Sequence, residues 1–293
     1  MSGLLFPPFF FFPIGFVVFP VLFNFLSNKN FLFKKKIFQF LCGFGYGLGL
    51  NFIVLIWIKD PFFVDDNTKN IFYLSYLLVI YSSIFYGLVF FTLSFIKNNY
   101  SRLILIPTLF VVVEIMRANI GYGFPWLTFA QVSSANSFTL GPIYFLGTYG
   151  LSFITIFIFI SPSIFALYDQ NDNKKYNNFF VLLLLILLLF LAFSFFRSFF
   201  QNDKIENNHL DISLAQLNFK QEDKIYNQNQ SDRLSNIINV VENSSSNLII
   251  FAENDFPFLI RNSEQLNVLQ EYLNKEQSII IGVTKKQESK YFN

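Results

Sequence analysis

Two ionisable side chains, Glu114 and Arg117, lie three positions apart near the end of an apolar run. In a helix this spacing places both side chains on one face, where a carboxylate and a guanidinium can form an ion pair. Ionisable groups at membrane depth are candidates for function, although groups close to the interface can reach water instead. The spacing favours a structural pair, and a functional role is the alternative.

A further carboxylate, Glu253, directly follows residues 247–252, a short apolar stretch typical of a buried strand. In open α/β sheets, active residues gather at the carboxyl ends of the strands. Beside Phe251, Phe256 and Pro257, a carboxylate could have a raised pKa and act as a general base. The residue types alone favour the alternative, which is a solvated loop glutamate.

The sequence holds one cysteine, Cys42, and one histidine, His209. A disulfide within the chain and a Cys/His metal cluster are therefore excluded, and we expect no metal and no other cofactor. Cys42 lies inside an apolar run without a neighbouring base and is a poor nucleophile candidate. His209 has no Ser or Cys partner nearby, and we expect it to be solvated. The few basic residues lie between apolar runs, which argues against nucleic-acid binding.

The composition divides the chain into two regions. Hydrophobic residues make up 53% of the 293 residues and charged residues 14%, against about 25% charged residues in soluble domains. From position 201 onward there are 9 Lys/Arg and 13 Asp/Glu, a net charge of −4, which leaves 12 and 6, a net charge of +6, in the first 200 residues. We therefore predict a membrane domain at residues 1–200 and a soluble domain at residues 201–293.

Apolar runs in the first region are long enough, or nearly so, to cross a bilayer as helices. We predict six spans, at residues 9–26, 37–58, 71–96, 103–116, 140–167 and 179–196. Basic residues concentrate in alternate connections, which the positive-inside rule places in the cytoplasm. These residues are Lys29, Lys34, Lys35, Lys36, Lys97, Arg102, Lys174 and Lys175. Six spans then put both the soluble region and residue 1 outside, and we expect the N-terminus to be shortened by one helix.

Four glycines alternate within the second run, at Gly43, Gly45, Gly47 and Gly49. A spacing of two does not match a phosphate-binding loop. Small residues let the backbones of membrane helices approach closely, so we predict a packing role.

Residues 121–127, GYGFPWL, form an outward-facing loop in this topology. The glycines and Pro125 prevent a continuous helix. Phe124 and Trp126 can anchor the loop at the lipid headgroups. Alternatively, the loop forms a lipid-facing gate beside an active site. The residue types alone favour the anchor.

The second region alternates strand and helix patterns. Strands are predicted at residues 210–217, 247–252 and 278–283, and helices at residues 231–243 and 263–275. This order favours a mainly parallel sheet with helices on its faces. Three strands and two helices leave an open sheet edge and bury little surface, so the region is expected to be the first part of a larger fold.

Three stretches resemble the bacterial apolipoprotein N-acyltransferases. Residues 111–131, VVVEIMRANIGYGFPWLTFAQ, are similar to that family's E-x-x-R followed by G-F-P-W-L, and residues 140–153 to the following helix start. LAQLNF and LIIFAENDFP, with Gln216, Asn218 and Glu253, resemble the first strands of its carbon–nitrogen hydrolase domain. The resemblance spans essentially the whole chain. It implies a multi-pass α-helical membrane domain followed by a partial α/β nitrilase-like domain.

The resemblance also implies an activity. The family transfers a fatty acyl chain from a membrane phospholipid to the N-terminal amine of a diacylglyceryl-cysteine lipoprotein through a Cys thioester, using a Glu, a Lys and a Cys. Glu253 matches the catalytic base by position, and Phe124 and Trp126 are the expected substrate-binding residues. The implied location is the bacterial inner membrane, with the soluble domain on the periplasmic side.

The sequence departs from the family's pattern near both ends. Residues 291–293 resemble a tyrosine–asparagine segment that precedes the family's Lys, whereas Lys285, Lys286 and Lys290 come before it. Neither that Lys nor the Cys has a match, and Cys42 cannot replace the latter. We therefore expect an inactive fragment. The alternative is a non-catalytic membrane relative that binds lipid or a partner. A small transporter would need inverted repeats or polar residues within several spans, and the sequence shows neither.

Overall fold

The computed structural model describes most of the chain as two compact units. The described residues are 1–28, 31, 34–121, 123–167, 173–200, 210–220, 223–224, 228–253, 255–260, 266–287 and 290–292. The first unit comprises Met1–Asp60 and Ile71–Asp203, and the second comprises Pro61–Asn70 and Lys204–Asn293. Each unit is treated by itself below.

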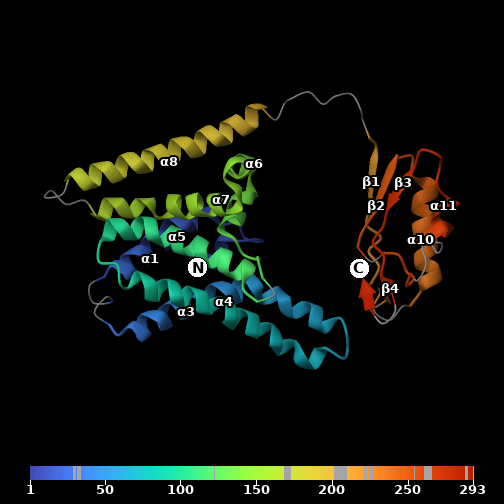
Figure 1. Cartoon of the computed structure of the whole chain (residues 1–293), viewed down its shortest axis with the longest axis horizontal. Coiled ribbons are helices and arrows are strands. Elements are labelled where there is room, and N and C mark those ends of the chain that lie inside the picture. The colour runs from blue at the N-terminus through green and yellow to red at the C-terminus, as the bar shows by residue number, and fades with distance from the viewer. Residues whose placement is uncertain are drawn as a thin grey trace. The chain divides into compact units, whose positions relative to one another are not determined.

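The first unit is a bundle of helices (Figure 1). Its α-helices are α1 (Gly15–Ser27), α3 (Lys36–Leu55), α4 (Ser75–Leu93), α5 (Asn99–Asn119), α6 (Ser137–Leu140), α7 (Ile143–Ile160) and α8 (Asn173–Phe200). Shorter 3-10 segments precede or extend them: η1 (Ser2–Leu5), η2 (Phe12–Ile14), η3 (Ile56–Phe63), η4 (Lys69–Leu74), η5 (Phe129–Ala135) and η6 (Ser161–Leu167).

Membrane-spanning length and apolarity are found in four segments of the described chain. They are Lys36–Phe63, Lys69–Leu93, Ile143–Leu167 and Tyr176–Phe196. The segment Phe12–Ser27 is apolar but shorter. The helix α5, which carries Arg102, Glu114 and Arg117, is not among the four. Four of the six predicted runs therefore qualify as candidate spans, and the count of six stays a prediction.

An aromatic cluster joins α1, α5, η5 and α7. The ring of Phe19 lies 6.0 Å from Phe110, 5.6 Å from Phe129 and 5.8 Å from Phe159, measured between centroids. All four side chains are buried. The Phe19 ring meets Phe110 and Phe129 edge-on and stacks on Phe159, and such ring pairs add directional contacts to the burial of apolar area. The cluster therefore fixes η5, which borders the candidate site, against three helices.

Two of the four alternating glycines lie where α3 meets α4. A Cβ added to Gly43 would lie 2.5 Å from the backbone oxygen of Tyr86, and one added to Gly47 would lie 2.9 Å from the Cα of Ser83. Gly45 and Gly49 have nothing within 4 Å of an added Cβ. The predicted packing role is confirmed for Gly43 and Gly47, which let the two backbones approach.

The second unit contains a three-stranded parallel sheet with the order β1-β2-β3. Its elements are β1 (Ile212–Ala215), α10 (Gln230–Asn243), β2 (Leu248–Phe251), α11 (Asn267–Gln270) and β3 (Ser278–Ile280). The predicted order of strands and helices is confirmed, with shorter strands. The second helix was predicted at residues 263–275; its first three residues lie outside the described residues, and α11 covers only Asn267–Gln270. A short antiparallel pair, β4 (Lys285–Gln287) and β5 (Lys290–Phe292), follows the sheet and was not predicted.

The two faces of this sheet differ in their surroundings. In Figure 1, α10 and α11 lie on the same face of the sheet, where Ile237 and Val241 of α10 pack with Ile249 and Phe251 of β2 in one core. Alternate residues of a strand point to opposite faces. Leu214 of β1, paired in register with Ile250, belongs to the other face and is 79% exposed. The described part of this unit thus has one covered and one uncovered apolar face.

Candidate functional site

A tight loop follows α5 and reverses the chain. Gly121 and Gly123 have φ angles of +68° and +71°, in the left-handed region that glycine enters without strain. A Cβ on Gly123 would lie 2.5 Å from the oxygen of Ala118. The amide of Phe124 donates to the carbonyl oxygen of Arg117 at 2.7 Å and closes the loop. The glycines of GYGFPWL therefore end the helix, as predicted.

Glu114 and Arg117 hold the far end of this loop. The Glu114 Oε1 accepts a hydrogen bond from the amide of Phe129 at 2.7 Å, and the Arg117 Nη2 donates to the carbonyl oxygen of Leu127 at 2.5 Å. Their exposed fractions are 2% and 1%. Between these two described residues the structure gives no direct ion pair, so the predicted pair is corrected. Both side chains bind the loop backbone instead, because the last turns of α5 lie beside the loop, and this contact gives them a structural role.

The segment after the loop is fastened to α7. The amide of Ala130 donates to the Ser152 Oγ at 2.9 Å, and the hydroxyls of Ser133 and Thr155 lie 3.0 Å apart. All of these groups are buried. Polar side chains at regular helical spacing on α7 thus bind the start of η5 and set the distance between the two elements.

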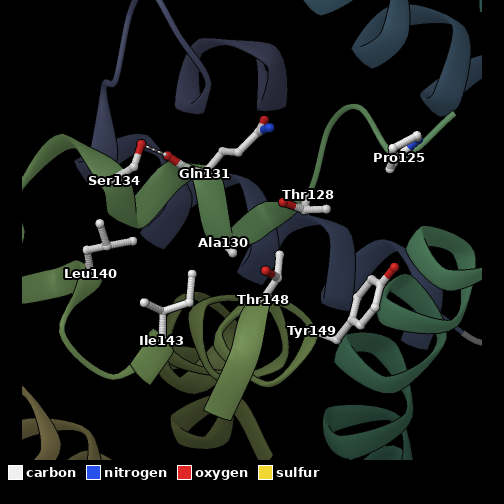
Figure 2. Close-up of a pocket in the computed structure, with 9 residues that line it drawn as sticks. All are labelled: Pro125, Thr128, Ala130, Gln131, Ser134, Leu140, Ile143, Thr148 and Tyr149. Atoms are coloured by element: carbon white, nitrogen blue, oxygen red, sulfur yellow. Dashed lines mark hydrogen bonds between the residues drawn. The ribbon is translucent and has the colours of Figure 1, made fainter. Parts of the chain in front are cut away.

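A pocket of about 470 Å³ lies between this segment and the first half of α7 (Figure 2). Figure 2 shows Thr148 and Tyr149 pointing toward the segment that carries Thr128 and Ala130. The helix α7 is kinked at Gly147, which has a φ of +64° and a ψ of −179°. The complete lining is Pro125, Thr128, Ala130, Gln131, Ser134, Leu140, Ile143, Thr148 and Tyr149. Its volume and its mixture of apolar side chains with a few hydroxyl and amide groups are typical of small-molecule sites.

Neither of the two residues that the sequence proposes for substrate binding is among the residues that line this pocket. Trp126 is 48% exposed, and its ring centroid lies 5.3 Å from that of Trp57. Phe124 is half-buried. Pro125, between them, lines the pocket, whereas the sequence pattern did not single out Thr128, Gln131 or Tyr149. The available signal was Gly147 in LGTYG, because a glycine can adopt the positive φ that kinks α7 directly before Thr148, which lines the pocket.

Glu253 lies in the second unit, on the turn after β2. Its side chain is exposed, whereas Phe251, Phe256 and Pro257 are buried. The exposed side chain agrees with the solvated loop glutamate that the residue types favoured, because Phe251 and Phe256 pack into the core and Glu253 does not. Cys42 is half-buried in α3, and His209 lies outside the described residues.

Asp255 fixes the turn that carries Glu253. This carboxylate is 1% exposed, accepts from the Lys224 Nζ at 2.8 Å and accepts from the amide of Ala252 at 3.2 Å. The Arg233 Nη2 donates to the backbone oxygen of Asp255 at 3.3 Å. Burial lowers the pKa of the Arg233 guanidinium, and the nearby carboxylate of Asp255 acts in the opposite direction. The sequence pattern gave no signal for Asp255, because its charged partners Lys224 and Arg233 are distant along the chain.

Comparison with known proteins identifies the family. Residues 1–161, more than half of the chain, match the apolipoprotein N-acyltransferase N-terminal domain. The apolipoprotein N-acyltransferase of Wigglesworthia glossinidia brevipalpis is 26% identical over 306 residues, which cover 98% of this chain and 56% of the relative. Those of Rickettsia typhi and Rickettsia prowazekii are each 30% identical, over 59% and 62% of this chain and 34% and 35% of the relatives.

The chain thus spans about half the length of the first of these relatives, and the alignments with the two others cover about a third of theirs. The matched N-terminal domain includes α5, the loop at residues 121–127 and all residues that line the pocket. On these matches, the chain belongs to the apolipoprotein N-acyltransferase family.

Proposed function

We propose that this chain supplies the membrane domain and the first part of the nitrilase-like domain of an apolipoprotein N-acyltransferase. In the proposed reaction, a Cys thiolate attacks a phospholipid ester, a thioester forms, and the lysophospholipid alcohol leaves. The N-terminal amine of a diacylglyceryl-cysteine lipoprotein then attacks the thioester, an amide forms, and the thiol is released. The proposed location is the bacterial inner membrane with the second unit on the periplasmic side, supported by the Lys and Arg distribution.

The pocket beside the loop at residues 121–127 is the proposed site for the phospholipid acyl chain. This assignment rests on one observation, which is that a cavity of about 470 Å³ with a largely apolar lining adjoins a loop held by buried charged side chains. Leu140, Ile143 and Pro125 offer apolar contact to a chain. The hydroxyls of Thr128 and Thr148 can donate hydrogen bonds to an ester carbonyl.

Trp126 and Phe124 are the proposed border of this site. They flank Pro125, and the ring of Trp126 is partly exposed. An amphipathic indole at a membrane interface can contact both headgroup and chain. In this arrangement the pair guides the lipid to the pocket, and its anchoring role and its gating role are served by the same rings.

Glu253 is the proposed general base, acting on the thiol proton. Its place at the carboxyl end of the middle strand of a parallel sheet supports the proposal. The buried Asp255 two residues later holds the turn that carries it.

Photo-crosslinking tests the site directly. The purified chain in lipid nanodiscs would receive a phospholipid with a diazirine in its acyl chain, followed by irradiation and peptide mapping. We expect adducts enriched in residues 125–149 over the exposed apolar surface of α8, which serves as an internal reference for general lipid contact. Equal labelling of both segments, with no saturation and no competition by unlabelled phospholipid, would refute the site.

A further inference from the structure

We propose that Glu114 and Arg117 are positioning residues that set the shape of the pocket, an inference that rests on the proposed lipid site. They occupy one turn of α5 and bind the loop backbone at Leu127 and Phe129. Thr128, which lies between these two anchored residues, lines the pocket. The two contacts therefore straddle a lining residue and fix its position from both sides.

The two contacts are chemically complementary. A carboxylate only accepts hydrogen bonds and a guanidinium only donates them. Glu114 receives an N–H of the backbone, and Arg117 gives to a C=O two residues earlier. Charge-assisted hydrogen bonds are stronger than those between neutral groups. One helix turn thus specifies the direction of the loop backbone as well as its location.

Leu127 has a backbone conformation that needs such support. Its φ is +73°, in the left-handed region that a side chain with a Cβ rarely adopts, and its side chain is fully buried. Such conformations persist only where the surroundings determine them. The carbonyl that Arg117 binds is that of Leu127 itself. The guanidinium therefore binds the loop at a residue whose backbone conformation is strained.

Stability alone is a weak reason for these charges. The Arg117 Nε and Nη1 are buried without a hydrogen-bond partner among the described residues. A buried guanidinium with unsatisfied donors is often no more stabilising than an apolar side chain of similar size. The two side chains are needed to position the loop backbone, because an apolar side chain could bind neither the Phe129 amide nor the Leu127 carbonyl oxygen.

A buried arginine at the other end of the same helix provides a matched control. Arg102 is also fully buried in α5, and its guanidinium donates to the Asn99 Oδ1 and to the backbone oxygen of Ile96. Arg102 and Arg117 lie about 22 Å apart along the helix axis. Replacing either one removes a buried guanidinium that binds a backbone carbonyl, but only Arg117 contacts the loop.

The experiment uses Trp126 as the reporter. In a Trp57→Phe background it is the sole tryptophan, so its fluorescence anisotropy reports loop mobility, and lipid photolabelling of residues 125–149 reports the pocket. We expect Arg117→Met to lower the anisotropy and to raise the half-saturating phospholipid concentration about tenfold. We expect Arg117→Lys, which keeps a donor, and Glu114→Gln, which keeps an acceptor, to show smaller effects in the same direction.

The control variant separates positioning from folding. Arg102→Met is expected to lower the unfolding temperature as Arg117→Met does, but to leave both the anisotropy and the labelling unchanged. If Arg117→Met matches Arg102→Met in all three readouts, the role is purely structural and the inference is wrong. If Arg117→Met does not accumulate as folded protein, Glu114→Gln decides by the same comparison. If the Trp57→Phe background protein shows no saturable labelling, the proposed lipid site is wrong. The anisotropy of Trp126 then still shows whether Arg117 restrains the loop.

Discussion

The loop after α5 in the first unit and the turn after β2 in the second unit are both held by buried charged side chains that bind the backbone. In the loop, Glu114 and Arg117 bind backbone groups from a neighbouring helix. In the turn, Asp255 binds the amide of Ala252 and the ammonium group of Lys224. In each case a buried charged side chain satisfies backbone or charged groups that a loop would otherwise leave unpaired.

What surrounds the two differs. The loop borders a formed pocket, and η5 behind it is packed by aromatic rings. The turn carries an exposed Glu253 beside a sheet whose described surroundings cover one face, with Leu214 on the other. In both regions a buried charged side chain fixes the backbone position of the candidate residue. The burial of that residue depends instead on the helices and strands that pack around it.

The largest expected effect comes from the turn. Asp255→Ala leaves Lys224 without its buried carboxylate and the Ala252 amide without its acceptor. Removing one member of a buried ion pair costs about 3–5 kcal/mol. Hydrogen exchange of the β2 amides would measure the loss. Glu242→Ala, an exposed carboxylate on α10, is the control and should change little. A loss of protection of the same size in both variants would show that the turn does not depend on the buried Asp255 carboxylate.

Glycine substitutions in α3 test the packing of the first unit. Gly47→Ala places a Cβ 2.9 Å from the Cα of Ser83, and such overpacking costs about 1–3 kcal/mol. Gly45→Ala meets open space and should stabilise the helix by up to about 1 kcal/mol. Denaturant titration of the protein in mixed micelles would measure both. Shifts of the same sign for the two variants would contradict the assigned helix interface.

The smallest effect is expected at Glu253. Glu253→Gln changes an exposed side chain on a turn fixed by other residues, so the free energy of unfolding should change by less than about 0.5 kcal/mol. Lipid photolabelling of residues 125–149 should also be unchanged. Thermal unfolding and peptide mapping would measure these quantities. A large destabilisation would mean that Glu253 itself holds the turn, which would weaken the proposal of a general base.

Much of the fold was predictable because it follows from periodicity and local chemistry. The apolar runs of α3, α4, α7 and α8 and the strand–helix alternation around β2 are properties of contiguous residues. The loop was also foreseen, since Gly121, Gly123 and Pro125 cannot continue a helix.

The contacts that shape the sites were not predictable in the same way. Residue spacing suggested that Glu114 would pair with Arg117, but tertiary packing brought Phe129 and Leu127 closer in their place. Asp255 meets Lys224 across a long sequence separation that no local pattern encodes. The exposure of Glu253 likewise depends on how its turn is held, and its catalytic role stays a prediction.

Filling the pocket is the most direct test of the account. Thr148→Phe puts a ring into the cavity beneath Ala130, and Thr92→Phe makes the same change at an exposed position of α4 away from it. The measurement is the concentration of photoreactive phospholipid that half-saturates labelling of residues 125–149. We expect Thr148→Phe to raise it about tenfold and Thr92→Phe to leave it unchanged. Equal half-saturation in both variants and in the unsubstituted chain would contradict an acyl-chain site at this pocket.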